Sequence, residues 1–480
     1  MKIQLSLSCL FFLFVFGCTT KPKAVIKTET KTYTDWYQVS TGKPVALVFA
    51  SYKTTMLANG TDEALLRISA IDSTGMEIMD AKLAFEISVK GDATVQEIDG
   101  TAPDVVSKTD SMLVWKSQLT NGIKTLILKS GTTMDRIKVE VKTDSLWPAS
   151  HEIHTIPASV ELLKPKASQL QPSPKIETEM IGADISFLPQ LESRGMTFYD
   201  KGVETDAIVI LKDHGFNYIR LRVFVNPENE KGYSPNTGFC GLENTLKMAR
   251  RVKDAGLNLL LDFHYSDTWA DPQKQYKPKA WEGLAFEELT TRLKTYTKSV
   301  LLELKEQGTM PDMVQVGNEI NHGIVWPEGH ISNLDNLAAL LKAGTEAVRE
   351  VDASTTVMMH LALGGQNEET VFWFDNMIAR GVEFDIIGLS YYPQWHCTLD
   401  DLNANMLDII NRYQKDINVV EYSAFKREVH DLVFNLPENR GNGTCIWEPL
   451  NTWSRIFDRQ GNALDDITIY DEMKTQYLTD

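Results

Sequence analysis

The sequence predicts an α/β protein in which a (β/α)8 TIM barrel is preceded by an all-β sandwich domain. Two stretches with different patterns lead to this prediction. Positions 34–156 hold short segments in which apolar and polar residues alternate, separated by turn residues. Positions 176–480 hold apolar, β-branched runs that alternate with helical periodicities. A period of two is typical of antiparallel sheets, whereas strands that alternate with helices indicate β–α–β units.

Length, charge and cysteine content exclude several classes of protein. The chain has 480 residues, of which 43% are hydrophobic, so it is too apolar to be disordered. Its 48 basic and 65 acidic side chains give a net charge of −17, and the basic ones are scattered. Nucleic acid is therefore not expected as a partner, because phosphate binding needs a concentrated basic face. Five cysteines in so long a chain exclude a disulfide scaffold.

The N-terminus resembles a bacterial lipoprotein signal. Lys2 precedes an apolar run over positions 5–16, which is too short to span a bilayer. The run leads into Gly17-Cys18, which is similar to a lipoprotein processing site. Positions 1–17 are therefore predicted to be removed, Cys18 to carry a lipid anchor in the membrane, and positions 18–33 to form a basic tether. The expected location is the bacterial outer membrane, on its cell-surface or periplasmic face, and an ordinary signal peptide is the alternative.

The all-β domain is predicted at 34–156. Its clearest strands cover 45–50, 64–70, 82–89 and 137–141, with breaks at Asn59-Gly60, Gly91-Asp92 and Asn121-Gly122. Positions 54–75 resemble immunoglobulin-like modules that are appended to bacterial glycosidases. We expect the domain to act as a spacer rather than to bind sugar. A linker rich in proline and serine follows at 157–175.

Eight candidate strands follow the linker, which is the number that closes a (β/α)8 barrel. The strands are predicted at 180–185, 218–225, 257–263, 313–316, 356–360, 384–389, 417–420 and 444–447. Helices are predicted between them at 242–255, 285–307, 334–351, 368–379 and 399–414. Catalytic residues of such barrels lie at the carboxyl ends of the strands.

Two glutamates lie at these strand ends. Glu319 follows the fourth predicted strand, and Glu421 follows the seventh. Two carboxyl groups that face each other across a cleft permit glycoside hydrolysis, because one protonates the leaving oxygen and the other attacks the anomeric carbon. A separation of about 5–5.5 Å gives retention of configuration, and about 6.5–9.5 Å gives inversion. Either glutamate alone could be a rim residue in an ion pair, so the pair is the informative feature.

The motifs around these glutamates resemble those of glycoside hydrolase family 53, the endo-β-1,4-galactanases. The resemblance covers 182–453, and its most specific pieces are DFHYSDTWADP at 262–272 and GLSYYPQWH at 388–396. The other pieces are GADISF at 182–187, IRLRVFVNP at 219–227, QVGNEI at 315–320, VWPEG at 325–329 and IWEP at 446–449. This resemblance implies a retaining enzyme whose catalytic glutamates lie on strands 4 and 7.

The resemblance also implies a role for each matching residue. Glu319 would be the general acid/base, Glu421 the nucleophile, and Asn318 a hydrogen-bond partner of the sugar 2-hydroxyl. Arg220 and Arg222 share strand parity, and Arg222 is expected beside Glu421 because it lies nearer the end of its strand. The remaining candidates are His264, Asp267 and Trp269 after strand 3, Tyr391 or Tyr392 as a donor to the nucleophile, Trp447 as the floor, and Trp326 and Trp395 as sugar platforms.

Other roles stay open for some of these residues. His264 could be a core histidine, Trp326 and Trp395 could pack loops, and Glu448 is a rival carboxylate at the end of strand 8. No two of the nearby histidines have the i, i+4 spacing of a zinc site. Glu421 is followed by YSAFKREVH instead of the acidic calcium loop that some family members carry. We therefore expect no metal in that loop and no cofactor.

The motifs thus predict a membrane-tethered, retaining endo-β-1,4-galactanase that acts on the β-1,4-galactan side chains of pectin. Another retaining endo-glycanase of the same clan, such as a β-mannanase, is the nearest alternative, because the shape of a sugar pocket is invisible in sequence. A surface glycan-binding lipoprotein with a degenerate barrel is the alternative from a different class. It predicts the loss of a catalytic residue, whereas Glu319, Glu421, Asn318 and Arg222 are all present.

Overall fold

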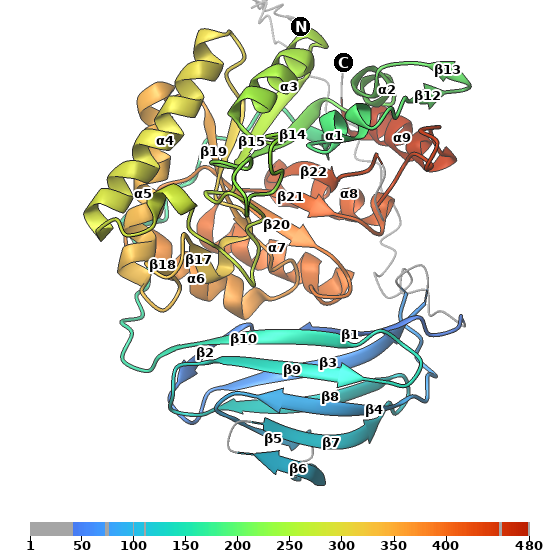
Figure 1. The fold of residues 1–480 in the computed structure, drawn as a ribbon, viewed down its shortest axis with the longest axis vertical. Helices are drawn as coiled ribbons and strands as arrows, with labels where there is room; N and C mark the ends of the chain where they lie inside the picture. The colour runs from blue at the N-terminus through green and yellow to red at the C-terminus, as the bar shows by residue number, and fades with distance from the viewer. Residues whose placement is uncertain (1–41, 73–75, 99, 110–111, 451–453, 479–480) are drawn as a thin grey trace, which may run out of the picture. The chain divides into compact units, whose positions relative to one another are not determined.

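The computed structural model describes residues 42–72, 76–98, 100–109, 112–450 and 454–478. The predicted signal peptide, the lipidated Cys18 and the basic tether lie outside these residues and stay predictions. The described chain consists of an N-terminal all-β domain, a proline-rich connecting segment and a barrel (Figure 1). Within these ranges, none of the helices combines the length and the apolar character that crossing a bilayer requires.

The N-terminal domain consists of two sheets around a shared core. A four-stranded sheet has the order β1-β3-β8-β5, and a six-stranded sheet has the order β2-β10-β9-β4-β7-β6. Neighbouring strands are antiparallel, except that β2 and β10 run parallel. Ile137, Val139 and Val141 alternate along β9 and join an apolar cluster to which both sheets contribute. The strands are β1 (Ala46–Ser51), β2 (Thr55–Ala58), β3 (Glu63–Ile71), β4 (Ala84–Lys90), β5 (Ala93–Glu97), β6 (Val105–Thr109), β7 (Met112–Gln118), β8 (Ile123–Ser130), β9 (Arg136–Lys142) and β10 (Ala149–Pro157).

This arrangement confirms the prediction of an all-β domain ahead of the barrel. Its immunoglobulin-like character stays a prediction. The connecting segment that follows β10 is hydrogen-bonded to the barrel. Gln169, in the short helix η2 (Ala167–Gln169), donates to the Ile378 carbonyl oxygen at 2.9 Å, and Arg440 donates to the Ser173 carbonyl oxygen at 3.1 Å.

Eight parallel strands close the barrel in chain order, which confirms the predicted fold (Figure 1). The predicted strands are all present, with ends that differ by at most three residues. They are β11 (Met180–Asp184), β14 (Tyr218–Val223), β15 (Asn258–Phe263), β16 (Met313–Val316), β19 (Thr356–Leu361), β20 (Ile386–Tyr391), β21 (Asp416–Tyr422) and β22 (Gly441–Trp447). Both faces of these strands are buried, and the mostly apolar runs include buried polar positions such as Arg220 and Gln315.

Helices cover the outside of the barrel (Figure 1). They are α1 (Leu188–Ser193), α2 (Ala207–Asp213), α3 (Leu242–Asp254), α4 (Phe286–Glu306), α5 (Leu334–Val351), α6 (Asn367–Ala379), α7 (Leu399–Tyr413), α8 (Lys426–Phe434) and α9 (Thr468–Tyr477). Thr398 caps α7, because its hydroxyl accepts a hydrogen bond from the Asp401 backbone N–H.

The interior of the barrel changes from apolar to polar along the strands. One layer is apolar and consists of Met180, Tyr218, Leu260, Met313, Met358, Ile386, Val420 and Cys445. Alternate residues of a strand share a face, so the next inward positions on four strands are Arg220, Asp262, Gln315 and His360. All four side chains are buried and hydrogen-bonded to one another. This polar layer supports the site at the carboxyl ends of the strands.

Candidate active site

Glu319 lies just beyond β16, where the backbone turns sharply out of the strand. Gly317 has a φ of 90°, and a Cβ at that position would approach the Ile320 side chain to 2.6 Å. Glu319 itself adopts a φ of 48° and a ψ of 54°, a left-handed conformation that is uncommon for residues with a side chain. The turn brings the carboxyl group into a cleft, where the Ser390 hydroxyl donates to its Oε1 at 2.8 Å.

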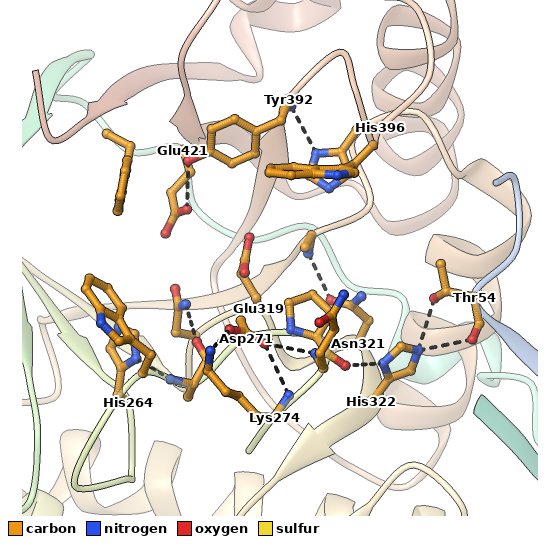
Figure 2. Close-up of a pocket in the computed structure, with 18 of the residues that line it drawn as sticks. Thr54, His264, Asp271, Lys274, Glu319, Asn321, His322, Tyr392, His396 and Glu421 are labelled. Carbon is orange, nitrogen blue, oxygen red and sulfur yellow. Dashed lines mark hydrogen bonds and ion pairs between the residues drawn. The ribbon is translucent and has the colours of Figure 1, made fainter. Parts of the chain in front are cut away.

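Glu421 reaches the same cleft through an irregularity in β21. Leu389 of β20 pairs with Val419, but the next residue, Ser390, pairs with Glu421, so the register skips Val420. Val420 packs in the apolar layer inside the barrel, and in a regular strand the following side chain would face outward. The shift turns Glu421 inward. Figure 2 shows both carboxyl groups in the pocket.

The cleft has a volume of about 440 Å³ and brings together residues that are far apart in the sequence. Most of the predicted site residues line it. They are Arg222, His264, Trp269, Asn318, Glu319, Tyr392, Trp395, Glu421 and Trp447. A cleft with aromatic walls and a pair of carboxyl groups suits a sugar chain, because the rings can stack on sugar faces while polar groups bind hydroxyls.

Arg220, rather than Arg222, supports Glu421. The Arg220 guanidinium lies 2.8 Å from Oε1 of Glu421, 3.0 Å from Asp184 and 2.9 Å from Asp262. The expectation that Arg222 lies beside Glu421 is therefore wrong. The two arginines share a face of β14, and Arg222, which lies nearer the strand end, pairs with a different carboxylate.

That carboxylate is Glu448, which forms a buried ion pair with Arg222. Their side chains are at most 1% exposed, and Nη1 of Arg222 lies 2.6 Å from Oε1 of Glu448. The same oxygen accepts a hydrogen bond from the Phe187 backbone N–H at 2.9 Å. The Arg222 guanidinium also lies between rings, 4.5 Å from the centroid of Phe187 and 4.4 Å from that of Trp269. Glu448 is thus enclosed by protein, which argues against it as a rival catalytic carboxylate.

The surroundings of the two carboxyl groups in the cleft shift their pKa values for different reasons. Burial raises the pKa of Glu319 well above its ordinary value, and the negative charge of Glu421 raises it further. Burial also raises the pKa of Glu421, but the Arg220 guanidinium opposes that shift. We therefore place the proton of the pair on Glu319, so that Glu319 can act as an acid while Glu421 is ionised.

The two tyrosines after β20 have different environments. The Tyr392 hydroxyl donates to Oε2 of Glu421 at 3.1 Å, as expected for the donor to the nucleophile. The Tyr391 hydroxyl instead donates to the Cys397 carbonyl oxygen at 3.4 Å, and Tyr391 is not among the residues that line the cleft. Tyr392 is thus the residue that fits the role.

The two candidate sugar platforms also differ. Trp395 lines the cleft and is 42% exposed, so its ring is available to a ligand. Trp326 is 8% exposed, and its indole N–H donates to the His322 carbonyl oxygen at 2.8 Å. The structure corrects the expectation for Trp326, which packs a loop instead of lining the cleft.

Asp267 holds loops together and does not reach the cleft. Its carboxylate accepts hydrogen bonds from the backbone N–H groups of Asn226 at 3.0 Å and Lys279 at 2.8 Å, and from the Asn229 side chain at 2.6 Å. The prediction that Asp267 lines the cleft is wrong, because these loop donors occupy its oxygens. His264 does line the cleft, as expected.

Sequence reasoning missed the residues that position Glu319. Ser390 donates to Glu319 and lies 2.8 Å from Nε2 of His360, whose Nδ1 lies 3.0 Å from the Gln315 side chain. Ser390 stands two residues after Gly388, and therefore on the same face of β20. Strand alternation was a signal that could have placed Ser390 inside the barrel.

Metal binding was not expected in the loop after Glu421. In the part of the chain that the structure describes, no group of three or more His, Cys, Asp or Glu side chains is arranged to hold a metal ion. After Glu421 the chain leaves β21 and enters α8 within a few residues. A loop without calcium and an enzyme without a cofactor stay predictions.

Comparisons with known sequences cover both domains. A sequence model of glycosyl hydrolase family 53 matches residues 180–431, which include Glu319 and Glu421. A model of the glycoside hydrolase family 2 C-terminal domain 5 matches residues 47–152. The N-terminal domain therefore lies outside the family 53 match.

Individual relatives agree with the first of these models. The chain is 37% identical over 262 residues to an arabinogalactan endo-β-1,4-galactanase of Cellvibrio japonicus, over 52% of this chain and 67% of that protein. It is 37% identical over 249 residues to arabinogalactan endo-β-1,4-galactanase A of Aspergillus niger, over 50% of this chain and 69% of that protein. The solved family 53 catalytic domain from Ignisphaera aggregans is 32% identical, with a TM-score of 0.58 over 62% of this chain and 98% of that domain.

Proposed function

Because the chain belongs to glycosyl hydrolase family 53, we propose that it is a retaining endo-β-1,4-galactanase that cleaves the β-1,4-galactan side chains of pectin. The observation that carries the proposal is the pair of Glu319 and Glu421 in one cleft, with Arg220 and Tyr392 on the nucleophile. The similar proteins from Cellvibrio japonicus and Aspergillus niger are named for galactanase activity.

The first step forms a covalent glycosyl-enzyme. A carboxylate oxygen of Glu421 attacks the anomeric carbon while Glu319 transfers its proton to the glycosidic oxygen, and the bond to the leaving sugar breaks. Arg220 and Tyr392 hold the attacking carboxylate in place and favour its ionised form. The raised pKa of Glu319 keeps it protonated until the leaving oxygen needs the proton.

The second step releases the sugar. Glu319, now a carboxylate, takes a proton from a water molecule, whose oxygen attacks the anomeric carbon and breaks the ester to Glu421. Two inversions restore the β configuration. The Asn318 amide is fixed because its oxygen accepts from Arg220 at 2.9 Å and its nitrogen donates to the Ala270 carbonyl oxygen at 2.9 Å. Its position next to Glu319 suits a hydrogen bond to the sugar 2-hydroxyl.

Product analysis on linear β-1,4-galactan tests the proposal. We expect internal cleavage that releases a mixture of galacto-oligosaccharides, with the β anomer as the first product seen by NMR. An α anomer would contradict the role of Glu421 as the nucleophile. A panel of galactan, mannan, xylan and glucan tests the substrate, since a preference for mannan would favour the β-mannanase alternative. Binding to galactan without any cleavage would favour the glycan-binding alternative.

Replacing Ser390 with alanine should move the alkaline limb of the pH–rate profile to higher pH. The Ser390 hydrogen bond lowers the pKa of Glu319, so its loss raises that pKa and the acid form persists to higher pH. The rate at the optimum should fall about two- to tenfold, because one hydrogen bond is lost. Profiles of kcat/KM for the wild type and Ser390→Ala check this, and a move of the limb to lower pH would contradict it.

A further inference from the structure

The N-terminal domain donates hydrogen bonds to a buried carboxylate of the barrel. Glu369, on α6, is 3% exposed and accepts hydrogen bonds from the hydroxyls of Thr54 and Thr55, both at 2.7 Å, and from the Thr54 backbone N–H. The Thr54 hydroxyl also lies 3.0 Å from Nε2 of His322. A buried carboxylate without donors would strongly destabilise the fold. The contact is therefore specific, and it holds the start of β2 against the barrel.

Strand β10 extends this contact. Ile153 belongs to the core of the N-terminal domain, so the alternate residues Ser150, Glu152 and His154 face away from that core. The His154 ring stacks on His322 of the barrel, with 3.9 Å between the centroids. The face of β10 that carries Ser150 and Glu152 is therefore turned toward the barrel.

Arg136, on the neighbouring strand β9, reaches the loop that follows β15. Its guanidinium donates to the Gln273 carbonyl oxygen at 3.3 Å and lies 4.8 Å from the centroid of the Trp326 ring. It also lies 3.9 Å from the Glu152 carboxylate. Glu152 thus stands near the loop at 271–274, which lines the cleft.

These contacts make the N-terminal domain part of the catalytic cleft. Its contribution to the lining is Thr54, Ser150, His151 and Glu152. Figure 2 shows Thr54 bonded to His322, in the same pocket as Glu319 and Glu421. Ser150 is exposed and the Glu152 side chain is 24% exposed, so both are accessible to a ligand.

We propose that Ser150 and Glu152, together with Gln273 and Lys274, form the wall of an additional sugar subsite, so that the N-terminal domain helps to bind the polysaccharide. The inference rests on the proposed function and adds a binding role for a domain that lies outside the family 53 match. A carboxylate, a hydroxyl, an amide and an ammonium group offer both acceptors and donors, which suits the hydroxyls of a neutral galactosyl residue. A longer chain would occupy this subsite while its scissile bond lies between Glu319 and Glu421.

The test compares long and short substrates in the full chain. The double variant Ser150→Ala/Glu152→Gln removes the hydroxyl and the charge, and Glu86→Gln, on the exposed face of β4, is the matched control. We measure the ratio of kcat/KM for polymeric galactan to that for galactotriose. The ratio should fall about fivefold in the double variant, through a higher KM for the polymer, and should keep its wild-type value in Glu86→Gln. An unchanged ratio in the double variant, including a parallel loss on both substrates, would overturn the proposal.

A binding measurement separates the subsite from any effect on the chemical step. In the inactive Glu421→Ala background, calorimetry gives the affinity for galacto-oligosaccharides of increasing length. The gain in affinity with length should shrink when Ser150 and Glu152 are also replaced, and an unchanged gain would overturn the proposal. Wild-type activity on galactan tests the proposed function by itself. If the wild type prefers another glycan, the same ratio is measured with that polymer and its trisaccharide, so the two failures stay distinguishable.

Discussion

Replacing Glu421 with alanine is expected to lower the rate of reducing-end release from β-1,4-galactan by about 10⁴-fold or more. The variant lacks the oxygen that attacks the anomeric carbon, and loss of a covalent nucleophile removes the lowest route through the transition state. Release of reducing ends, measured with wild type and Glu421→Ala at equal concentration, checks this. Glu243→Ala is the matched control, because Glu243 is an exposed carboxylate on α3 with a side chain that is 82% exposed.

Azide distinguishes a lost nucleophile from a misfolded protein. In Glu421→Ala the small anion can enter the vacated space and attack the anomeric carbon once, which yields an α-glycosyl azide from a substrate with a good leaving group. Near-normal hydrolysis by the variant would contradict the role of Glu421. Rescue by azide with a β-configured product would contradict the single-displacement chemistry expected of the variant.

Replacing Arg220 with methionine should have the largest effect on stability. The substitution leaves Glu421, Asp184 and Asp262 without the guanidinium that lies within 3.0 Å of each of them. Loss of one partner from a buried ion pair typically lowers the free energy of unfolding by about 3–5 kcal/mol. Chemical denaturation of wild type and Arg220→Met measures the change. A loss below about 1 kcal/mol would contradict the network described for Arg220.

The pH profile of the same variant tests which arginine serves the nucleophile. Arg220 lowers the pKa of Glu421, so its removal raises that pKa and shifts the acidic limb of the activity profile to higher pH. Arg222→Met is the matched control, since it also breaks a buried pair but with Glu448. It should lose stability and leave the acidic limb in place. A shift of that limb in Arg222→Met alone would restore the original expectation for Arg222.

The barrel and the places of Glu319 and Glu421 at its strand ends could be predicted from local sequence patterns. The strands are buried on both faces, so a run such as 386–389 is apolar without alternation and differs from the periodicity of the amphipathic helices. Glu319 and Glu421 follow such runs directly, and the carboxyl ends of parallel strands meet at one end of a barrel. The motif at 262–272 resembles family 53, and this resemblance implied catalytic roles for the two glutamates.

The predictions that were wrong concern contacts between residues that are distant in the sequence, and local patterns do not show such contacts. Arg220 and Arg222 both point into the barrel, so strand alternation cannot tell which of them pairs with Glu421. The position of Glu421 along the barrel axis decides it. That position follows from the register shift at Val420, which the residue types around it do not predict. The Asp267 carboxylate accepts hydrogen bonds from backbone N–H groups of other loops, which the local sequence does not show. The contact between Thr54 and Glu369 joins residues 315 positions apart, so no local signal could place the N-terminal domain at the cleft.

The left-handed backbone at Glu319 makes this fold less stable than the same fold with glycine at that position. A residue with a side chain costs about 1–2 kcal/mol in that conformation, and glycine would remove the cost. Glu448, at the end of β22, has a φ of 44° and carries a similar penalty. Engineering for heat resistance has to seek its gains away from these strand ends, since the simplest stabilising change at Glu319 would remove the acid.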